Sequence, residues 1–409
     1  MKKKYLAFGV GAILCIVGLA FWVWQIVHGM VITNLRNPFS WGLYMGTFEF
    51  FIGVSSGGML LFCIAYLWRV EGLVPFARLG SVVSLACVIA SGVAIMTDLG
   101  QPLRVLKMLL YPQLGSPLFW DVVVLGLYAV VCLAAVVIQV APYAKRNRGS
   151  RGALMVRDER SRKLSYLALP MMVIMNVVTS LMFAVQNTRE WWHSALLPVD
   201  SVTVAVSAGL GVMLLICAVT VGREGWAKHE ADFRLLAKIA AVALLAHICF
   251  SILELVPLKW SGTAESRELL ELVLGRYGWL YAVEMVLTVV AMLIFFVPLS
   301  SASGKVLGCT GVLTLIAAFA HRMMQLLPAF NAFPLTLPIT AGGETIQWSF
   351  PIATGVFAEG EDLFVRFWDY FPSAMELAVN LLPFGLVILL VAGSLILEQR
   401  ADDGGTVSA

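Results

Sequence analysis

Long apolar runs alternate with short polar segments along almost the whole chain. A run of about 20 apolar residues is long enough to cross the hydrocarbon core of a bilayer as a helix. Ten such runs are present, which predicts ten membrane-spanning helices. They cover approximately residues 5–29, 41–68, 77–97, 119–143, 164–187, 201–221, 235–257, 280–300, 306–327 and 373–397. Because the number of spans is even, both termini are expected on one side of the membrane.

The composition agrees with this pattern. Of the 409 residues, 60% are hydrophobic and 13% are charged, whereas charged residues make up about 25% of a soluble domain. The predicted fold class is therefore an all-α polytopic membrane protein, and no nucleic-acid partner is expected. The first run is too long for the apolar core of a signal peptide and no small-residue cleavage site follows it. It is predicted to be a retained first span.

The Lys and Arg residues predict the orientation, since cytoplasmic loops carry an excess of them. With the N-terminus inside, 19 of the 28 lie on the cytoplasmic side and 9 outside. Both termini are thus predicted to be cytoplasmic, and the basic stretch 145–163 is expected to be a solvated cytoplasmic linker. The long loops are then outside, at 99–118, 258–279 and 328–372. Long ordered loops tend to carry function, so the working face is expected to be the outer one.

Ionisable residues within the spans gather in their outer halves. A charge in lipid is costly and usually marks a functional position. The clearest case is Glu49, because apolar residues flank it and its carboxylate must be paired or protonated. The others are Asp98, Asp121, Glu254, Glu284, His321, Arg322 and Glu376. This pattern suggests one polar pocket near the outer leaflet, suited to a lipid-soluble substrate that exchanges protons. For Asp98, Asp121 and Glu376, which lie at helix ends, a plain interfacial position is the alternative.

Cysteine and histidine spacing predicts no metal site. The seven cysteines fall in seven different apolar runs, whereas an iron–sulfur cluster needs several thiolates close together. Of the five histidines, only His247 and His321 lie well inside spans, and counting along the helices puts them at different depths. No pair for a haem is therefore expected.

Three stretches resemble the NrfD/PsrC family, the polysulfide reductase membrane subunits. They are NPFSWGLYMGTFEFFIGVSSGGMLL (37–61), SGVAIMTDLGQPLRVLKML (91–109) and WWHSALLPVDSVTVAVSAGLGVMLL (191–215). The second is similar to the family's Asp-Leu-Gly-x-Pro-x-Arg signature. Beyond residue 300, AFAHRMMQLLPAFN and WDYFPSAMELAVNLLPF resemble the ten-span HybB/DsrP-like branch.

The resemblance implies two four-helix bundles with additional helices. The expected division is a first helix (1–34), a first bundle (35–190), a second bundle (191–327), a periplasmic loop (328–372) and a last helix with a cytoplasmic tail (373–409). It also implies a quinone site near the periplasmic face and no haem or iron–sulfur cluster in the chain itself. The implied partners are a four-cluster ferredoxin-like iron–sulfur subunit and a catalytic subunit of molybdopterin, hydrogenase or cytochrome type.

Within this scheme, Glu49, Asp98 and Asp121 come from three successive spans and are expected to converge on one quinone pocket. Quinone reduction takes up two protons with two electrons, so acids close to the carbonyl oxygens are required. Trp41 and Tyr44 are expected at the mouth of the pocket, and Arg104 is expected to pair with one of the acids.

Three further assignments concern the surroundings of this pocket. Ser55, within the small-residue patch that ends at Gly58, is assigned to the quinone site, and the patch is expected to let helices approach closely. His193, Tyr370 and Glu376 are expected to form the docking surface of the partner.

The predicted function is a quinone-reactive subunit of a respiratory oxidoreductase in the bacterial cytoplasmic (inner) membrane. It would use menaquinone or ubiquinone and would not be the substrate-reducing catalytic subunit. Two alternatives are a proton-translocating, conformationally coupled subunit of such a complex and a solute transporter. Acidic residues in the inner halves would favour the first, and helices broken by Gly or Pro at corresponding midplane positions would favour the second.

Overall fold

The computed structural model describes residues 2–144, 151–297, 304–332, 336–341, 344–349, 352–354, 364–365 and 368–403. Within these residues, ten helices are long and apolar enough to cross a membrane, which confirms the predicted number of spans. They are α1 (Lys2–His28), α2 (Leu43–Tyr66), α3 (Val74–Asp98), α5 (Pro117–Ala144), α6 (Arg151–Ala184), α7 (Leu197–Thr220), α9 (Glu230–Trp260), α11 (Gly278–Phe296), α12 (Gly304–Asn331) and α13 (Ala374–Asp403). The chain is a multi-pass, all-α membrane protein.

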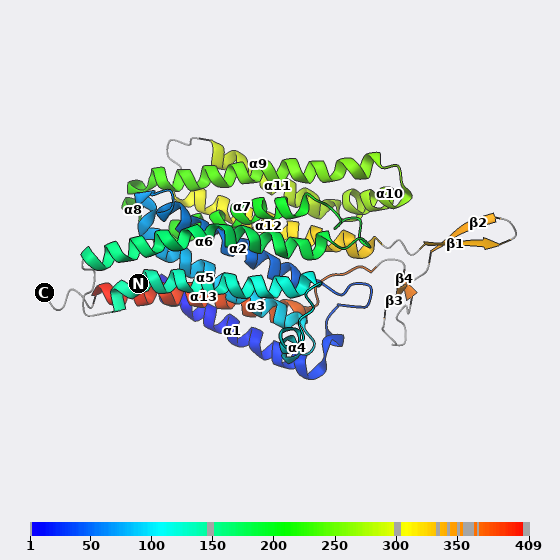
Figure 1. Cartoon of the computed structure of the whole chain (residues 1–409), viewed down its shortest axis with the longest axis horizontal. Coiled ribbons are helices and arrows are strands. Elements are labelled where there is room, and N and C mark those ends of the chain that lie inside the picture. Colours follow the sequence, from blue (N-terminus) through cyan, green and yellow to red (C-terminus); the bar gives the residue numbers. More distant parts are fainter. Residues whose placement is uncertain are drawn as a thin grey trace.

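The helices run roughly along the long axis of the molecule, and the first residues of α1 and the last turns of α13 lie at the same end (Figure 1). The opposite end carries the short helices α4 (Val105–Leu110) and α10 (Ala264–Glu271), while α8 (Arg223–Lys228) lies at the end of the termini. We refer to the end with α4 and α10 as the outer end, because the Lys and Arg distribution predicts that it is extracytoplasmic. Four short 3₁₀ or π segments complete the helices: Met30–Ile32, Glu71–Leu73, Pro102–Arg104 and Leu272–Arg276.

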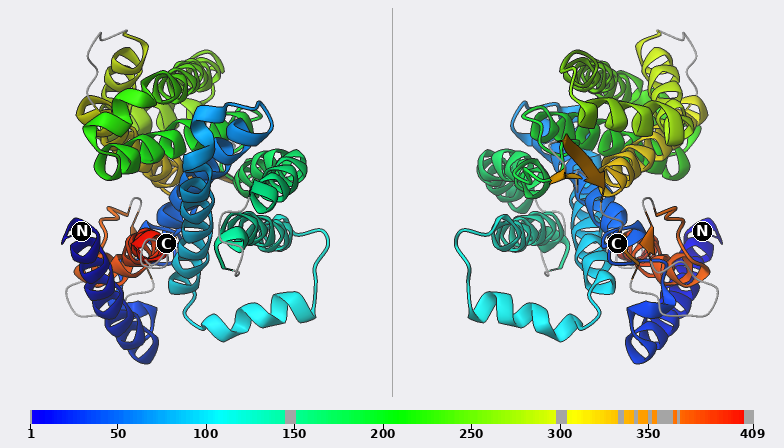
Figure 2. Two further views of the ribbon diagram at one scale, coloured as in Figure 1. Left: turned by 90° about the vertical axis from the view of Figure 1, so that its left-hand side faces the viewer. Right: turned by 90° about the vertical axis from the view of Figure 1, so that its right-hand side faces the viewer.

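Helix packing gives three neighbouring groups. Helices α2, α3, α5 and α6 contact one another, as do α7, α9, α11 and α12, and α1 packs along α13 (Figure 2). Helix α2 also packs against α7 and α12, so it joins the first two groups. The division of the chain into domains with boundaries near residues 34, 190, 327 and 372 stays a prediction.

Every residue of α2 is buried. A helix that is apolar all round belongs in the middle of a structure rather than at its surface. Its glycines permit this position: a Cβ on Gly57 would lie 1.9 Å from the backbone of Gly209 in α7, and one on Gly58 would lie 2.3 Å from Gly80 in α3. The close helix approach expected at the small-residue patch is thereby confirmed.

Two loop predictions need correction. The basic stretch 145–163 is not a linker throughout, because α6 is helical from Arg151 onward. Its charges suit the first turns of a helix that extends past the apolar core; Lys163 and Glu159, for example, form an i,i+4 ion pair of 2.7 Å. In the loop 328–372, α12 continues to Asn331, and two short hairpins pair β1 (Thr336–Ala341) with β2 (Glu344–Ser349) and β3 (Ile352–Ala353) with β4 (Phe364–Val365).

Candidate functional site

Glu49 is paired with an arginine from a distant part of the chain. Its side chain is buried about two turns from the start of α2, and Arg322 of α12 donates to its Oε2 at 3.2 Å. The same guanidinium donates to Ser201 at 3.1 Å and to Gln325 at 3.2 Å, so the charge is well partnered. Glu49 Oε1 is buried and has no hydrogen-bond partner. A buried pair of this kind adds little to stability, and its retention is easier to explain by function.

Asp121 lies on the same side of α2 as Glu49. It begins α5, is buried, and accepts a hydrogen bond of 2.7 Å from Thr179 of α6. Asn176, one turn before Thr179 on α6, donates to Ser56 at 2.7 Å, and Ser56 lies two turns from Glu49 on the same side of α2. The structure therefore brings these two predicted site residues together.

Asp98 lies elsewhere, at the outer end of α3. It lines a cavity of about 330 Å³ together with Met30, Arg36, Asn37 and Ser40. Two polar atoms of the residues around this cavity, Asp98 Oδ1 and Arg36 Nε, are buried without a hydrogen-bond partner. Asp98 thus offers a free acceptor at a cavity that Glu49 does not line.

Tyr44 belongs to the Asp98 side of α2. Its hydroxyl donates to Gln25 of α1 at 2.5 Å, and Gln25 in turn donates to the carbonyl of Thr97, next to Asp98. Five residues at 100° each turn the helix by about 140° beyond a full turn, so Tyr44 and Glu49 point to different sides of α2. The residues predicted for one pocket are therefore divided between two places.

The remaining predicted quinone-site residues have other surroundings. Arg104 is exposed, and within the described residues no ion pair joins it to Asp98. The chain turns away after Asp98, and Arg104 ends a 3₁₀ turn that projects from the bundle. Trp41 packs in an aromatic cluster with Phe183, Trp192 and Phe330. Ser55 donates to a carbonyl of its own helix at 2.6 Å.

Of the three predicted docking residues, only His193 is exposed. Glu376 is fully buried; it accepts a hydrogen bond from the Tyr370 hydroxyl and one of 2.5 Å from the backbone of Asn34. The Tyr370 hydroxyl also accepts from the backbone N–H of Leu43 at the start of α2. Burial, together with the nearby charge of Glu376, raises the pKa of the Tyr370 phenol above its ordinary range. The two residues fasten α13 to α2 from inside the protein and are not available as a surface.

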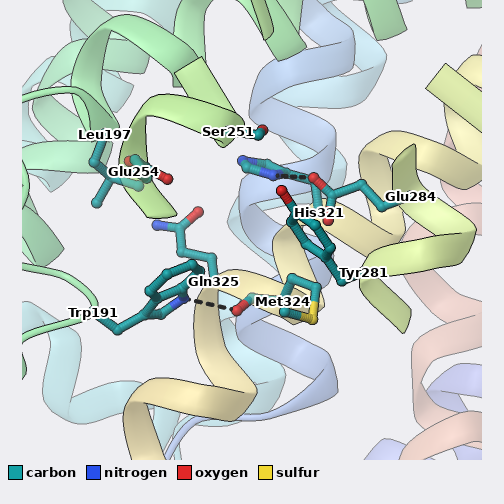
Figure 3. Close-up of a pocket in the computed structure, with 9 residues that line it drawn as sticks. All are labelled: Trp191, Leu197, Ser251, Glu254, Tyr281, Glu284, His321, Met324 and Gln325. Atoms are coloured by element: carbon teal, nitrogen blue, oxygen red, sulfur yellow. Dashed lines mark hydrogen bonds and ion pairs between the residues drawn. The ribbon is translucent and has the colours of Figure 1, made fainter. Parts of the chain in front are cut away.

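A second buried cluster lies in the group formed by α7, α9, α11 and α12, and each helix contributes one residue. Asp200 lies 2.8 Å from Nδ1 of His247, and Glu284 lies 3.2 Å from Nε2 of the same ring. Glu284 is also 2.8 Å from Nδ1 of His321 (Figure 3). Nε2 of His321 is 3.7 Å from Asp200. Two carboxylates and two imidazoles thus form a closed ring.

The different depths predicted for His247 and His321 are wrong, because their ring centroids are 4.8 Å apart. Depth was counted from the ends of the expected spans 235–257 and 306–327, but α9 runs from Glu230 to Trp260 and α12 from Gly304 to Asn331, so those ends do not mark one level. Asp200 was not singled out from the sequence. A usable signal was present, since four consecutive spans each carry one buried ionisable residue that can bind or exchange a proton.

A small cavity of about 20 Å³ adjoins this cluster, and Glu284, His321, Glu254 and Tyr281 are among its lining residues (Figure 3). This volume is sufficient for one water molecule. Helix α12 connects the cluster to the other site, because His321 is followed directly by Arg322, the partner of Glu49. A larger, mainly apolar cavity of about 480 Å³ lies between α11, α12 and residues 369–372.

Comparison with known proteins identifies relatives among the membrane components of reductases. The chain is 33% identical over 266 residues to a Halobacterium salinarum protein named as a membrane subunit of dimethyl sulfoxide reductase, over 62% of this chain and 60% of that protein. It is 23% identical to a selenate reductase subunit of Mesobacillus selenatarsenatis, over 81% of this chain and 83% of that protein. It is also 23% identical to the Hdr-like menaquinol oxidoreductase integral membrane subunit of Archaeoglobus fulgidus, over 56% of this chain and 53% of that protein. The match thus spans little more than half of the first and the third of these relatives.

The family comparison covers most of the chain. The sequence model of the polysulphide reductase NrfD family matches residues 31–334, which include helices α2 to α12 and all the acidic residues discussed above except Glu376. This stretch also contains the motifs at 37–61, 91–109 and 191–215 on which the resemblance was based. The chain therefore belongs to the polysulphide reductase NrfD family.

Proposed function

We propose that this protein is the quinone-reactive membrane subunit of a multi-subunit oxidoreductase. It exchanges electrons between the membrane quinone pool and an iron–sulfur subunit on the outer, periplasmic face, which connects it to a catalytic subunit. Family membership supports this proposal, as does the similarity to a menaquinol oxidoreductase membrane subunit. The quinone is a menaquinone or a ubiquinone.

The cavity beside Asp98 is the observation that carries the proposal. Its volume of about 330 Å³ lies within the range of small-molecule sites. Asp98 supplies an unpartnered carboxylate oxygen, and Arg36 supplies an unpartnered N–H. A quinone needs a donor to its carbonyl oxygen, and a quinol needs an acceptor for its hydroxyl proton. This pair offers both at the outer end, where an iron–sulfur partner has access.

Glu49 and Asp121 provide the alternative position for the quinone head group, on the other side of α2. Glu49 also has an unpartnered oxygen, and Trp41 and its aromatic neighbours lie toward the outer end of this region. A head group there would exchange its proton with Glu49, while Arg322 would stabilise the carboxylate after the proton has left.

The test compares Asp98→Asn with Glu49→Gln in the assembled complex. Both substitutions preserve shape and hydrogen bonding but remove the titratable proton. Quinol-linked turnover should fall by about 10²-fold in the variant whose substituted residue lines the quinone site, because this is the usual effect of losing a catalytic acid or base. Activity of the catalytic subunit with an artificial dye should be unchanged, because the dye bypasses the quinone.

Asp232→Asn at the inner end of α9, where the carboxylate contacts only His229 among the ion pairs of the described residues, serves as the control. It should leave both activities at the wild-type level. If quinol-linked turnover is also unaffected in Asp98→Asn and in Glu49→Gln, neither position holds the quinone and the proposal fails.

The polar groups that could carry protons inward from the outer acids give the proton-translocating alternative little support. Ser91 and Ser180 donate to carbonyls of their own helices, at 2.8 Å each. The Ser84 hydroxyl contacts Tyr128 and Cys132. These groups are satisfied locally and do not form a chain of proton carriers, so the quinone-reactive function is preferred.

A further inference from the structure

The cluster of Asp200, His247, Glu284 and His321 has no role in the proposed quinone site. Its four side chains come from four different helices, and all are at least nine-tenths buried. Sites for metal ions in helix bundles are built in this way, from inward-facing residues on facing helices. The question is what neutralises two carboxylates in the interior.

Charge balance allows two answers. Two buried carboxylates are too costly to leave uncompensated. They are neutralised by two protons, which can lie on the imidazoles or on the carboxyl groups, or by one divalent cation bound between neutral imidazoles. Geometry has to decide between two protons and one metal ion.

The hydrogen-bond pattern of the ring is incomplete. His321 Nε2 and Glu284 Oε2 are buried and have no hydrogen-bond partner. Fully protonated imidazoles would need an acceptor for each of four N–H groups, and His321 Nε2 finds none, since Asp200 is 3.7 Å away. This nitrogen faces the space between Asp200 and His247.

Three donor atoms of the cluster are close enough together for a coordination site. His321 Nε2 has no hydrogen-bond partner, whereas His247 Nδ1 lies 2.8 Å from Asp200 Oδ1, a contact that a bound ion would replace by two metal–ligand bonds. One donor atom each from Asp200, His247 and His321 lie within 4.8 Å of one another. Ligands at about 2.0 Å from a tetrahedral Zn²⁺ are about 3.3 Å apart. The contacts of 2.8 Å (Asp200 to His247) and 3.7 Å (Asp200 to His321) fall on either side of that value.

Glu284 occupies the position of a supporting carboxylate. Metal-binding histidines usually give their second ring nitrogen to a carboxylate, which fixes the orientation of the ring. Glu284 Oε1 is the partner of both rings, at 3.2 Å from His247 Nε2 and 2.8 Å from His321 Nδ1. This leaves His247 Nδ1 and His321 Nε2 directed toward Asp200.

We propose that Asp200, His247 and His321 form a binding site for a divalent transition-metal ion, with Glu284 orienting both imidazoles. Zn²⁺ fits this donor set best, because it accepts imidazole nitrogen together with carboxylate oxygen in a four-coordinate site. The adjoining cavity of about 20 Å³, which His321 and Glu284 line, has room for one water beside the site. The absence of a metal site predicted from the sequence depended on the different depths of the two histidines, and the packing removes that basis.

The bound ion would connect α7, α9 and α12 close to Arg322. Any ion that binds only the folded protein stabilises it, and the stabilisation increases as the logarithm of the free ion concentration once this exceeds the dissociation constant. A role in holding the second bundle together therefore follows directly from the site.

The experiment uses the purified full chain in detergent, first stripped with a strong chelator and then titrated with Zn²⁺. We expect one equivalent of zinc per chain by elemental analysis and a rise in the thermal unfolding midpoint. X-ray absorption should show two imidazole ligands together with oxygen. A wild-type chain that retains no zinc after titration and washing would overturn the proposal.

Substitutions of the cluster residues test whether the zinc ion binds at this site. His247→Gln and His321→Gln should abolish the stoichiometric zinc, whereas Glu284→Gln should weaken affinity by about 10- to 100-fold, as expected for an outer carboxylate. His229→Gln, the same change at the inner end of α9, is the matched control and should bind zinc like the wild type. Equal zinc binding by His247→Gln and His229→Gln would mean adventitious surface binding and would refute the site. If His247→Gln and His321→Gln fail to fold, the zinc affinity of Glu284→Gln tests the site instead, and an affinity equal to that of the wild type would refute it.

Discussion

At the scale of single residues, Glu49 shows how far a sequence can be interpreted and where interpretation ends. Its position in an apolar run predicts that it needs compensation, but the compensating residue, Arg322, is 273 positions away. Asp121 and Asp98 were both recognised as buried acids, yet only Asp121 shares a side of α2 with Glu49. The direction of a side chain depends on how its helix is rotated about its own axis. Apolar residues lie on all sides of α2, so the sequence pattern does not show which side faces which neighbour.

The Glu49–Arg322 pair leads to a prediction about stability. Arg322→Met leaves the Glu49 carboxylate buried and unpaired, which should destabilise the protein by about 3–5 kcal/mol. The double variant Glu49→Gln/Arg322→Met removes both charges and should recover much of this loss. Thermal unfolding of Arg322→Met, Glu49→Gln and the double variant in detergent measures the coupling. Additive effects in the double variant would show that the two charges do not depend on each other.

At the scale of elements, the sequence predicted the ten spans well because apolar run length is set by the bilayer itself. Helix ends were less predictable. The segment from Arg151 to Lys163 is helical although it is highly charged, since charge does not prevent a helix from extending into water. The same uncertainty at helix ends led to the wrong depths for His247 and His321, and so to the failure to recognise the cluster around them.

Contact between α2 and α7 supplies a prediction at this scale. Gly57→Ala would place a Cβ 1.9 Å from the backbone of Gly209, and no side chain can move aside to relieve the clash. The helices must separate, which should cost at least about 1–3 kcal/mol, as overpacking does elsewhere. Gly126→Ala in α5, where a Cβ meets nothing within 4 Å, is the control and should be neutral or slightly stabilising. Equal melting temperatures for the two variants would contradict this packing.

At the scale of the whole molecule, the two ends differ in what they offer a partner. The predicted cytoplasmic end carries the first residues of α1, the last turns of α13 and α8, whereas the outer end carries α4 and α10 (Figure 1). The cavities of about 480 Å³ and about 330 Å³ described above both involve residues of this outer end. Electron transfer requires the terminal cluster of an iron–sulfur subunit to lie close to the quinone, so the docking face and the quinone site should coincide.

Crosslinking tests this arrangement in the intact complex. A photoreactive residue placed at His193 or Gly115, both exposed at the outer end, should form crosslinks to the iron–sulfur subunit. The same residue at Glu224, exposed in α8 at the opposite end, is the control and should form none. His193 is the one predicted docking residue that remains on the surface, so its crosslink is the most informative. Crosslinks obtained only from Glu224 would put the partner on the opposite face of the membrane. The thickness of the membrane would then separate it from the Asp98 cavity, a distance too long for direct electron transfer.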